Sequence, residues 1–304
     1  MLADVLLPTA LAFIMFSVGL SLRPEDFRQV FVRPAALAAG LAGQLLLVPL
    51  AALAVVLFLG LPGEPAVGLL LLAACPGGAS SAFLTRLARG NTALSLTITV
   101  ISSLAALLTF PLLAKLVFVH LASGAFADAV GQLGALPVER LVGSVLVVTT
   151  LPTALGVALR RRLGQGGERV ERAVGRVATV FFAAIVLGTF LAHRHTILTS
   201  FPSVGPAALL LNVLAMAGGY ALVAAVGAGR RDAVAGAMEC GLQNAGLGIF
   251  VAISLLHNPP MAAPSVVYAL VMNMGALALV YLSRMRLARG CAFGGQQAGE
   301  QPRP

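Results

Sequence analysis

The chain has 304 residues, of which 59% are apolar and only 10% are Asp, Glu, Lys or Arg. Soluble domains carry about 25% of these charged residues, whereas the mean hydropathy here is +0.97. Uncharged runs at 34–63 and 195–229 each exceed the roughly 20 residues that a helix needs to cross a bilayer. The composition excludes secreted, fibrous and soluble nucleic-acid-binding proteins, and it predicts a polytopic membrane protein.

The net charge of +9 does not indicate a nucleic-acid-binding protein. The basic residues are spread over several short segments between the apolar runs, and the chain has no Trp. Neither a groove nor a stacking platform for bases is predicted, so we expect no nucleic-acid partner. The strong bias toward Arg over Lys, with abundant Ala and Gly, favours a bacterial source with a GC-rich genome.

Charged clusters and Pro/Gly turns divide the chain into nine apolar segments. All are predicted to be helical, because lipid offers backbone groups no partner outside a helix or a closed barrel. The runs are continuous, whereas a barrel would show alternating segments of about ten residues. The predicted fold class is therefore an all-α polytopic membrane protein with nine transmembrane helices. The segments lie at about 2–21, 34–59, 65–86, 91–119, 141–159, 177–193, 203–228, 232–256 and 263–283.

The basic residues also predict the orientation of the helices. With the N-terminus outside, the segments that face inward hold all of the 20 Lys and Arg residues except Lys115, Arg140 and Arg194. This split follows the positive-inside rule and predicts a multi-pass protein of the bacterial inner (plasma) membrane with a cytoplasmic C-terminus. The longest cytoplasmic connection is expected at 160–176, as a topology signal or, alternatively, as a site for anionic lipid headgroups.

Glu239 is the only charged residue between positions 233 and 283. A carboxylate at the bilayer centre costs at least about 2.5 kcal/mol, and no Lys or Arg is expected at its depth in any span. Gln243 and Asn244 follow within two helical turns, and nearby glycines weaken the helix. The pattern favours cation or proton handling over a neutral, hydrogen-bonded Glu, because broken helices in transporters expose carbonyl oxygens that ligate sodium.

A second interruption is predicted within 65–86, where Pro76, Gly77 and Gly78 follow one another. Proline removes a backbone donor and clashes with the preceding turn, so a continuous helix is not expected. The N–H groups of residues 79–81 would open the second half-helix and favour negative charge. Taken alone, the segment could also be a packing kink.

The two interruptions lie in the third and eighth spans, which cross the membrane in opposite directions. Two broken helices at corresponding positions of oppositely oriented halves are typical of an inverted-repeat secondary transporter. We expect them to cross near mid-membrane and to form the site. Ser95 and Thr99 on the fourth span, with Gln44 on the second, add oxygen atoms of the kind that hard cations prefer.

Three stretches of the sequence resemble the bile acid:sodium symporter family. They are MFSVGLSLRPEDF (15–27), ACPGGASSAFLTRLARGNTALSLTITVIS (74–102) and ECGLQNAGLG (239–248). The similarity covers nearly the whole chain and is that of a bacterial nine-helix member. It implies one transmembrane unit at 1–290 with an inverted repeat and two discontinuous crossing helices. Its panel would comprise about 1–33 and 139–196, its core about 34–120 and 203–288, and a disordered cytoplasmic tail would follow at 291–304.

The resemblance also implies the binding residues. One sodium site would use Ser81, Ser95, Thr99 and Glu239. A second would use Gln44, Glu239, Gln243 and the carbonyl groups of Cys240 and Leu242. The substrate anion would lie in the cleft between core and panel, near the amides of Ala79 and Ser80 and near Asn244 and Asn273.

The chain departs from the family pattern at two places. The family has Ser-Asn after the Pro-Gly-Gly turn where this chain has Ser81-Ala82, so the first sodium site lacks an oxygen ligand unless Ser80 or Thr85 compensates. The family's His-Asn pairs in the seventh and ninth spans are altered to Ala215-Met216 and Met272-Asn273. A preference for bile acids is therefore not expected to carry over.

These observations predict a secondary active transporter that carries out sodium-coupled symport of a small organic anion by alternating access. It would bind one or two Na⁺, contact membrane lipid and function as a monomer. No enzymatic activity is expected, because the sequence has no HExxH, GxSxG or P-loop pattern. The alternatives are a proton-coupled or single-sodium carrier of an organic anion and, from another class, a membrane sensor or enzyme that binds an anion without transporting it.

Overall fold

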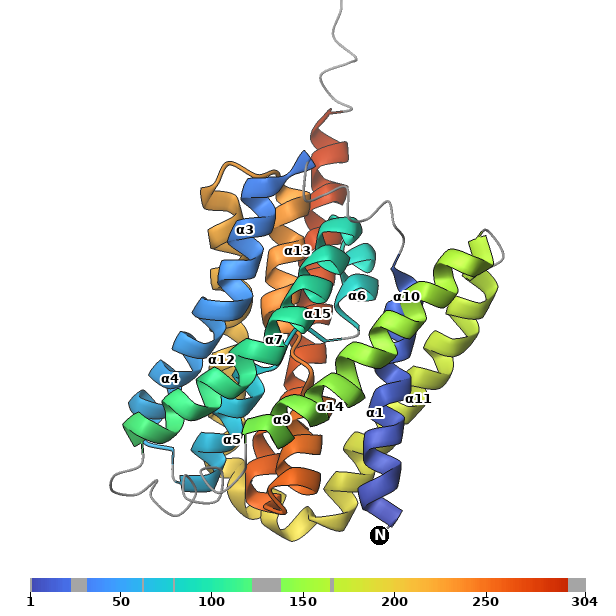
Figure 1. Ribbon diagram of the computed structural model, residues 1–304. Coiled ribbons are helices and arrows are strands. Elements are labelled where there is room, and N and C mark those ends of the chain that lie inside the picture. The colour runs from blue at the N-terminus through green and yellow to red at the C-terminus, as the bar shows by residue number, and fades with distance from the viewer. Residues whose placement is uncertain are drawn as a thin grey trace, which may run out of the picture.

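The computed structural model describes residues 2–22, 32–61, 63–78, 80–121, 138–164 and 167–294. Within these ranges the chain is helical, and the only β-type pairing is an isolated antiparallel bridge between Gly77 and Gln243. The arrangement is a bundle of long, tilted helices (Figure 1). The predicted all-helical class is confirmed for the part of the chain that the structure describes.

The elements follow the predicted segments closely. In chain order they are α1 (Leu2–Ser21), α3 (Pro34–Ala42), η2 (Gly43–Leu47), α4 (Val48–Leu59), α5 (Gly63–Ala74), α6 (Ser81–Leu87), α7 (Thr92–Leu121), α9 (Val138–Val145), η4 (Leu146–Thr150), α10 (Leu151–Leu163), α11 (Gly167–Ala192), α12 (Arg194–Ala225), α13 (Arg230–Gly241), α14 (Ala245–Phe250), η6 (Val251–Leu255) and α15 (Pro259–Gly294).

The elements η2 and η4 are π-helical turns inside longer helices, and each lies directly before a proline. Pro49 and Pro152 occupy the first turn of the helix that follows. A proline has no N–H to donate to the carbonyl four residues earlier, and its ring crowds that carbonyl, so the preceding turn widens. The helices continue through these turns, in agreement with the unbroken spans that the sequence predicts there.

Several helices are apolar and long enough to cross a membrane. Among the described residues these are Pro34–Leu59, Val142–Leu163, Gly167–Ala192, Arg194–Ala225 and Pro259–Met285, and four shorter apolar helices accompany them. Large apolar side chains such as Phe58, Leu108 and Met274 are more than two-thirds exposed. Such extensive apolar exposure fits a surface covered by lipid rather than by water. The chain is a multi-pass membrane protein.

Both predicted helix interruptions are present. The chain leaves helical geometry between the end of α5 at Ala74 and the start of α6 at Ser81. It does so again between the end of α13 at Gly241 and the start of α14 at Ala245, with Leu242 in an extended conformation. Proline and the paired glycines explain the first break, and the second coincides with the glycine-rich run after Glu239.

The helices form two groups. Helix α1 packs against α10, η4 and α11, whereas α12 packs against α13, α15 and α4, and α5 packs against α15, α4 and α7. In Figure 1, α1, α10 and α11 lie side by side on one flank, while α3, α4, α12 and α13 lie on the other. The broken helices α5–α6 and α13–α14 belong to the second, larger group.

Backbone contact holds α1 against α10. A Cβ added at Gly19 would lie 2.9 Å from the carbonyl carbon of Thr153, and one added at Gly156 would lie 2.8 Å from the backbone nitrogen of Leu20. Small residues let transmembrane helices approach this closely, because lipid supplies no hydrophobic drive for their association. Close packing of these two helices therefore depends on both glycines.

Three predicted boundaries differ from the structure. The prediction of a long connection at 160–176 is wrong. Helix α10 continues to Leu163 and α11 begins at Gly167, so most of this stretch is helical. Arg and Glu favour helices, so the helices extend past the charged positions at which the sequence predicts their ends. Helix α12 likewise begins at Arg194 and not near 203. Helix α15 reaches Gly294, within the tail expected to be disordered, and 295–304 lie outside the described residues.

We expect Gly156→Ala to lower the thermal stability of the detergent-solubilised protein. The added methyl group would force α1 and α10 apart, at a cost of about 1–3 kcal/mol. Gly188→Ala in α11 is the matched control, because a Cβ there meets no atom within 4 Å. Equal melting temperatures for the two variants would show that the contact between α1 and α10 does not depend on glycine.

Candidate functional site

The two interrupted segments lie against each other in an antiparallel crossing. The N–H of Gly78 donates to the carbonyl of Leu242 at 2.6 Å, and the N–H of Asn244 donates to the carbonyl of Pro76 at 3.0 Å. These bonds supply partners for backbone groups that the ends of the half-helices would otherwise leave unsatisfied. Segments that are more than 160 positions apart in the sequence thus form one structural unit, as the sequence predicted.

The glycines at the crossing are required by close approach. A Cβ at Gly77 would lie 2.5 Å from Oε2 of Glu239, and a Cβ at Gly78 would lie 2.9 Å from the carbonyl oxygen of Gln243. Any larger residue at either position would displace the carboxylate or separate the two backbones. The Pro-Gly-Gly sequence therefore breaks the helix and also makes room for Glu239.

Glu239 lies at the centre of a group of hydroxyls and is fully buried. Ser95 donates a short hydrogen bond to Oε1, and the hydroxyl of Thr99 donates to Oε2 at 2.8 Å. The hydroxyls of Ser81 and Thr99 lie 3.3 Å apart, and Thr85 donates to the Ser95 hydroxyl at 3.3 Å. Helices α6, α7 and α13 thus bring together all four residues of the first predicted sodium site and add Thr85.

The buried carboxylate has hydroxyl partners but no cationic one in the described part of the chain. Ion pairs there include those of Arg33 with Asp232 and of Arg160 with Glu171. A buried carboxylate is costly unless it is paired, protonated or bound to a cation. Hydroxyl and carboxylate oxygens are the ligands that hard cations prefer, and the described residues contain no cluster of three His, Cys, Asp or Glu. The donor set therefore fits sodium.

Of the residues predicted for the second site, Gln44, Gln243 and Cys240 are linked to one another, whereas the Glu239 carboxylate bonds to Ser95 and Thr99. Nε2 of Gln44 donates to the carbonyl of Cys75 and to Oε1 of Gln243, both at 3.0 Å, and Nε2 of Gln243 donates to the carbonyl of Cys240 at 2.8 Å. The carbonyl of Leu242 accepts from the crossing segment instead. The carbonyl of Cys75 was not predicted, although the last carbonyls of a half-helix are expected to lack helical partners.

Two further residues that sequence reasoning missed hold the end of α13 in place. The carbonyl of Gly241 accepts hydrogen bonds from Nδ2 of Asn212 at 2.9 Å and from the hydroxyl of Tyr268 at 3.0 Å. Both side chains are buried in otherwise apolar helices. Polar residues at membrane depth are expensive and commonly functional, so that signal could have identified them.

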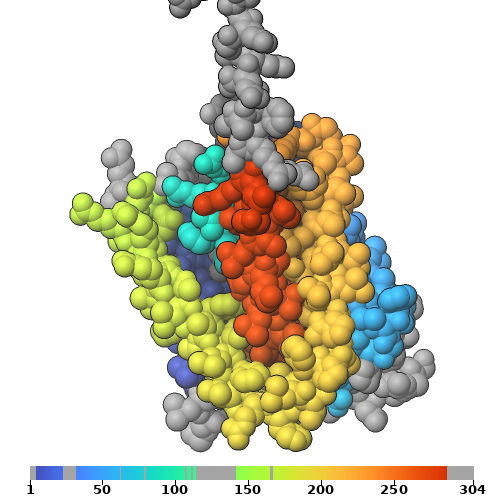
Figure 2. Space-filling view, turned by 180° about the vertical axis from the view of Figure 1, so that it is seen from behind, coloured from blue at the N-terminus to red at the C-terminus, as the bar shows by residue number. Residues whose placement is uncertain are grey.

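A large cavity lies beside the crossing, between α1 and α11 on one side and α6, α7, α14 and α15 on the other. Its volume is about 1790 Å³, above the roughly 300–1,000 Å³ of an ordinary ligand pocket. Figure 2 shows the molecule hollowed between α11, in yellow-green, and α15, in red. The polar residues lining the cavity near the crossing are Ser80, Gln243, Asn244 and Asn273.

The predicted substrate residues converge on this cavity as far as they are described. Oδ1 of Asn244 accepts from the N–H of Leu247 at 3.0 Å, and Nδ2 of Asn273 donates to the carbonyl of Ala269 at 2.7 Å. Asn244, Asn273 and Ser80 come from three different elements of the same wall. Ala79 lies outside the described residues.

The side chains around Ala82 separate the two possible replacements for its missing oxygen. Ala82 and Ser80 both line the cavity. Thr85 is fully buried and contacts Ser95, which in turn contacts Glu239. Of the two candidates, Thr85 is therefore the one whose hydrogen bonds lead to the carboxylate, through Ser95.

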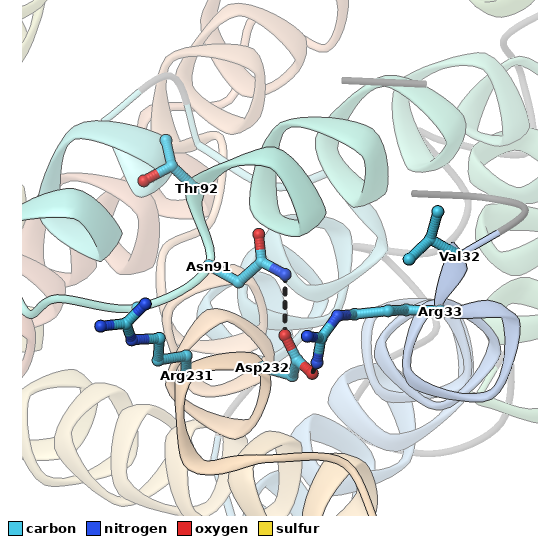
Figure 3. Close-up of a pocket in the computed structure, with 7 residues that line it drawn as sticks. Val32, Arg33, Asn91, Thr92, Arg231 and Asp232 are labelled. Carbon is cyan, nitrogen blue, oxygen red and sulfur yellow. Dashed lines mark hydrogen bonds and ion pairs between the residues drawn. The ribbon is translucent and has the colours of Figure 1, made fainter. Parts of the chain in front are cut away.

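A smaller pocket of about 360 Å³ lies at the end of the molecule where α3, α7 and α13 begin (Figure 3). Asp232 is its buried centre, and it pairs with Arg33 and accepts from Nδ2 of Asn91 at 2.7 Å. The backbone of Asn91 also donates to the carbonyl of Arg231 at 2.8 Å. These contacts tie three helix N-termini together, so the pocket is explained as a structural junction. The pairing of Arg33 was not foreseen from its role in topology.

Comparison with known proteins identifies similar sequences over most of the chain. The model of the Sodium Bile acid symporter family matches residues 8–200. The probable sodium/metabolite cotransporter BASS2 of Oryza sativa subsp. japonica chloroplasts is 31% identical over 283 residues, which are 92% of this chain and 64% of that protein. The uncharacterized sodium-dependent transporter YocS of Bacillus subtilis (strain 168) is 31% identical over 278 residues, 90% of this chain and 82% of that protein.

A third relative is the probable sodium/metabolite cotransporter BASS1 of Arabidopsis thaliana chloroplasts. It is 32% identical over 259 residues, which are 84% of this chain and 61% of that protein. The chain therefore spans less than two thirds of the length of both plant proteins.

We expect Tyr268→Phe to destabilise the protein by about 1 kcal/mol, the net contribution of one hydrogen bond. The combination with Asn212→Leu should cost more than the two single changes together, because the Gly241 carbonyl then loses both donors. Thermal unfolding of the single and double variants measures this coupling, and Tyr281→Phe, whose ring is exposed, is the control. Additive effects would contradict a shared role at this carbonyl.

Proposed function

The chain belongs to the sodium bile acid symporter family, and on this premise we propose that it is a secondary active transporter coupling the movement of a small organic anion to sodium. The observation that carries the proposal is the position of Glu239. Its buried carboxylate lies among hydroxyls at the crossing of two broken helices, and Gly78, Gln243 and Asn244 of the same crossing line a large cavity. Transporters of this architecture use such crossings as ion and substrate sites.

In the proposed cycle, sodium binds first as a co-substrate. One ion is held by Glu239 with the hydroxyls of Ser81, Ser95 and Thr99, and its charge neutralises the buried carboxylate. Thr85 supplies the oxygen that Ala82 lacks. The proximity of all four hydroxyls to Glu239 supports this assignment.

A second sodium ion would bind near the paired amides of the crossing. The amide oxygens of Gln44 and Gln243, with the carbonyl groups of Cys240 and Leu242, form the proposed site, and Glu239 completes it. The carbonyl of Cys75 is a further ligand, since it already faces Gln44. An ion there would draw these groups together and thereby fix the extended stretch that carries Gln243.

Sodium binding and anion binding would be coupled through the backbone. Gln243 belongs to the second sodium site, and the adjacent Asn244 lines the cavity. Ordering the first residue positions the second, and the acidic group of the substrate then binds near Asn244, Asn273, Ser80 and the amide of Ala79. Binding energy shared in this way makes each ligand raise the affinity for the other.

Alternating access would follow from movement of the two helix groups. The chain is proposed to cross the plasma membrane of a bacterium nine times as a monomer, with the N-terminus outside. The panel would comprise about 1–33 and 139–196 and the core about 34–120 and 203–288, and an inverted repeat would relate the N-terminal and C-terminal halves of the chain. The cavity between α11 and α15 lies between these two groups, which supports rocking of one against the other.

Proton coupling is the second candidate scheme, and Ala82 is the observation that favours it. With one oxygen fewer on α6, Glu239 would alternate between protonated and ionised forms, or the carrier would move a single sodium ion. Transport measured under separate sodium and pH gradients distinguishes these schemes.

We expect Glu239→Ala to abolish sodium-driven uptake, because the ion then loses the negative charge of its carboxylate ligand. A thermal-shift screen of carboxylates and sulfonates, with and without sodium, first identifies an anion whose stabilising effect requires the ion. Uptake of that compound into proteoliposomes is then measured, with Glu168→Ala, an exposed position on α11, as the control. Full uptake by the Glu239→Ala protein would refute the proposal, and uptake driven by pH alone would favour the second scheme.

We expect Thr85→Val to weaken sodium binding by up to about tenfold, since an isosteric change removes one oxygen worth about 1.4 kcal/mol at most. Sodium-dependent stabilisation measured by thermal unfolding gives the affinity without any need for substrate. Thr149→Val is the matched control, because that buried hydroxyl bonds only within its own helix, to Val145 at 2.6 Å. Unchanged sodium affinity in the Thr85→Val protein would remove Thr85 from the site.

A further inference from the structure

Four arginines line the large cavity at one end. Arg169, Arg172 and Arg176 lie on α11, and Arg86 lies on α6 across the cavity. In Figure 1, α6 and the first half of α11 lie at the same end of the molecule as the start of α3 and the end of α15. One acidic residue, Glu171, also lines this part of the cavity, and it pairs with the buried Arg160 at 3.7 Å.

The spacing of the three arginines on α11 places them on one helix face. Residues three and four positions apart are neighbours on a helix surface, so 169, 172 and 176 form a continuous stripe. The same stripe continues into the cavity along Ala183, Phe190 and their neighbours. The wall that α11 contributes to the cavity is therefore basic at its start, where the arginines lie, and mainly apolar farther along the helix.

A topology signal alone does not account for this arrangement. The positive-inside rule requires basic residues on the cytoplasmic side but does not specify the helix face on which they lie. Arg161 and Arg162, at the end of α10, are exposed and lie outside the cavity lining. These two would act equally well as a topology signal. The position of the other four arginines on the cavity wall therefore needs a separate explanation.

Clustered guanidinium groups on the wall of a cleft have a defined chemistry. They bind carboxylate, sulfonate and phosphate groups in bidentate geometry, and like charges lining a low-dielectric cleft concentrate counter-ions within it. Apolar residues such as Ile14, Phe182 and Val186 line the cavity beyond them. The combination fits an anion that also carries an apolar body.

We propose that Arg86, Arg169, Arg172 and Arg176 form a second anion-binding site at the mouth of the cavity, which receives the acidic group of an organic anion before or after it occupies the crossing. This site rests on the proposed function, in which the cavity is the substrate path. It is distinct from the crossing, because three of its four arginines lie on α11, which carries none of the proposed sodium ligands.

The test uses the full-length protein in nanodiscs of zwitterionic phosphatidylcholine. The probe is 8-anilinonaphthalene-1-sulfonate, an organic anion with an apolar body whose fluorescence rises in apolar surroundings. Its affinity is measured at constant sodium while choline chloride sets the ionic strength. The variants are Arg172→Gln with Arg176→Gln and, as a control equal in charge, Arg161→Gln with Arg162→Gln.

The expected result is an affinity that falls with salt in the unmodified protein. The Arg172/Arg176 variant should bind the probe about fivefold more weakly at low salt and show a flatter salt dependence, as for two solvent-exposed charge contacts. The Arg161/Arg162 control should match the unmodified protein. The proposal would be overturned if both variants bound the probe as tightly as the unmodified protein, or if both lost affinity to the same extent.

Two further arms separate the explanations. Anionic phosphatidylglycerol in the nanodiscs should leave the difference in affinity between the variants unchanged. If that difference disappears, the arginines bind lipid headgroups and the proposal is overturned. Sodium-dependent thermal stabilisation is recorded for the same samples. If sodium does not stabilise the unmodified protein, the proposed sodium coupling fails. The comparison of probe affinities between the variants concerns the arginines alone.

Discussion

The structure depends on a single burial problem, the carboxylate of Glu239 in the interior of a membrane protein. The backbone around it is broken in two places, and both breaks are paired with each other through the bonds between Gly78 and Leu242 and between Asn244 and Pro76. The glycines at 77 and 78 are present because no side chain fits beside the carboxylate and the opposing backbone. The hydroxyls of Ser95 and Thr99 surround the carboxylate with oxygen atoms.

The crossing is supported by groups that lie outside the proposed ion sites. Asn212 and Tyr268 bind the last carbonyl of α13, and the junction of Arg33, Asn91 and Asp232 joins the starts of α3, α7 and α13. A carboxylate must be held within about half an ångström to bind an ion selectively, which requires such a supporting shell. The packing of α1 on α10 forms a separate unit on the other side of the cavity.

Much of this arrangement could be predicted from the sequence, because lipid imposes strict rules on it. Long apolar runs must be helices, Pro76 must interrupt one of them, and Glu239 needs a compensating partner. The four residues of the first predicted sodium site lie together in the structure. The pairing of Gln44 with Gln243 and the use of the Cys75 carbonyl depend on the three-dimensional crossing, so no spacing in the sequence reveals them.

The errors have a common physical cause. Charged residues at 160–176 mark where the chain meets water, and we took that point as the end of the helix, but α10 and α11 continue through it. Helix ends and membrane surfaces are different boundaries, and only the second is signalled by charge. The cavity wall formed by the arginines of α11 follows from that extension, because a loop at 160–176 would not hold these side chains at fixed helical spacing.

The central claim is that a monovalent cation compensates the buried charge of Glu239. Equilibrium binding of radioactive sodium to the purified protein tests it most directly, with Glu239→Gln as the variant that keeps the side chain's shape and removes its charge. The account predicts saturable binding that unlabelled sodium displaces and potassium does not, and no such binding by the Glu239→Gln protein. Equal sodium binding by the two proteins would contradict it.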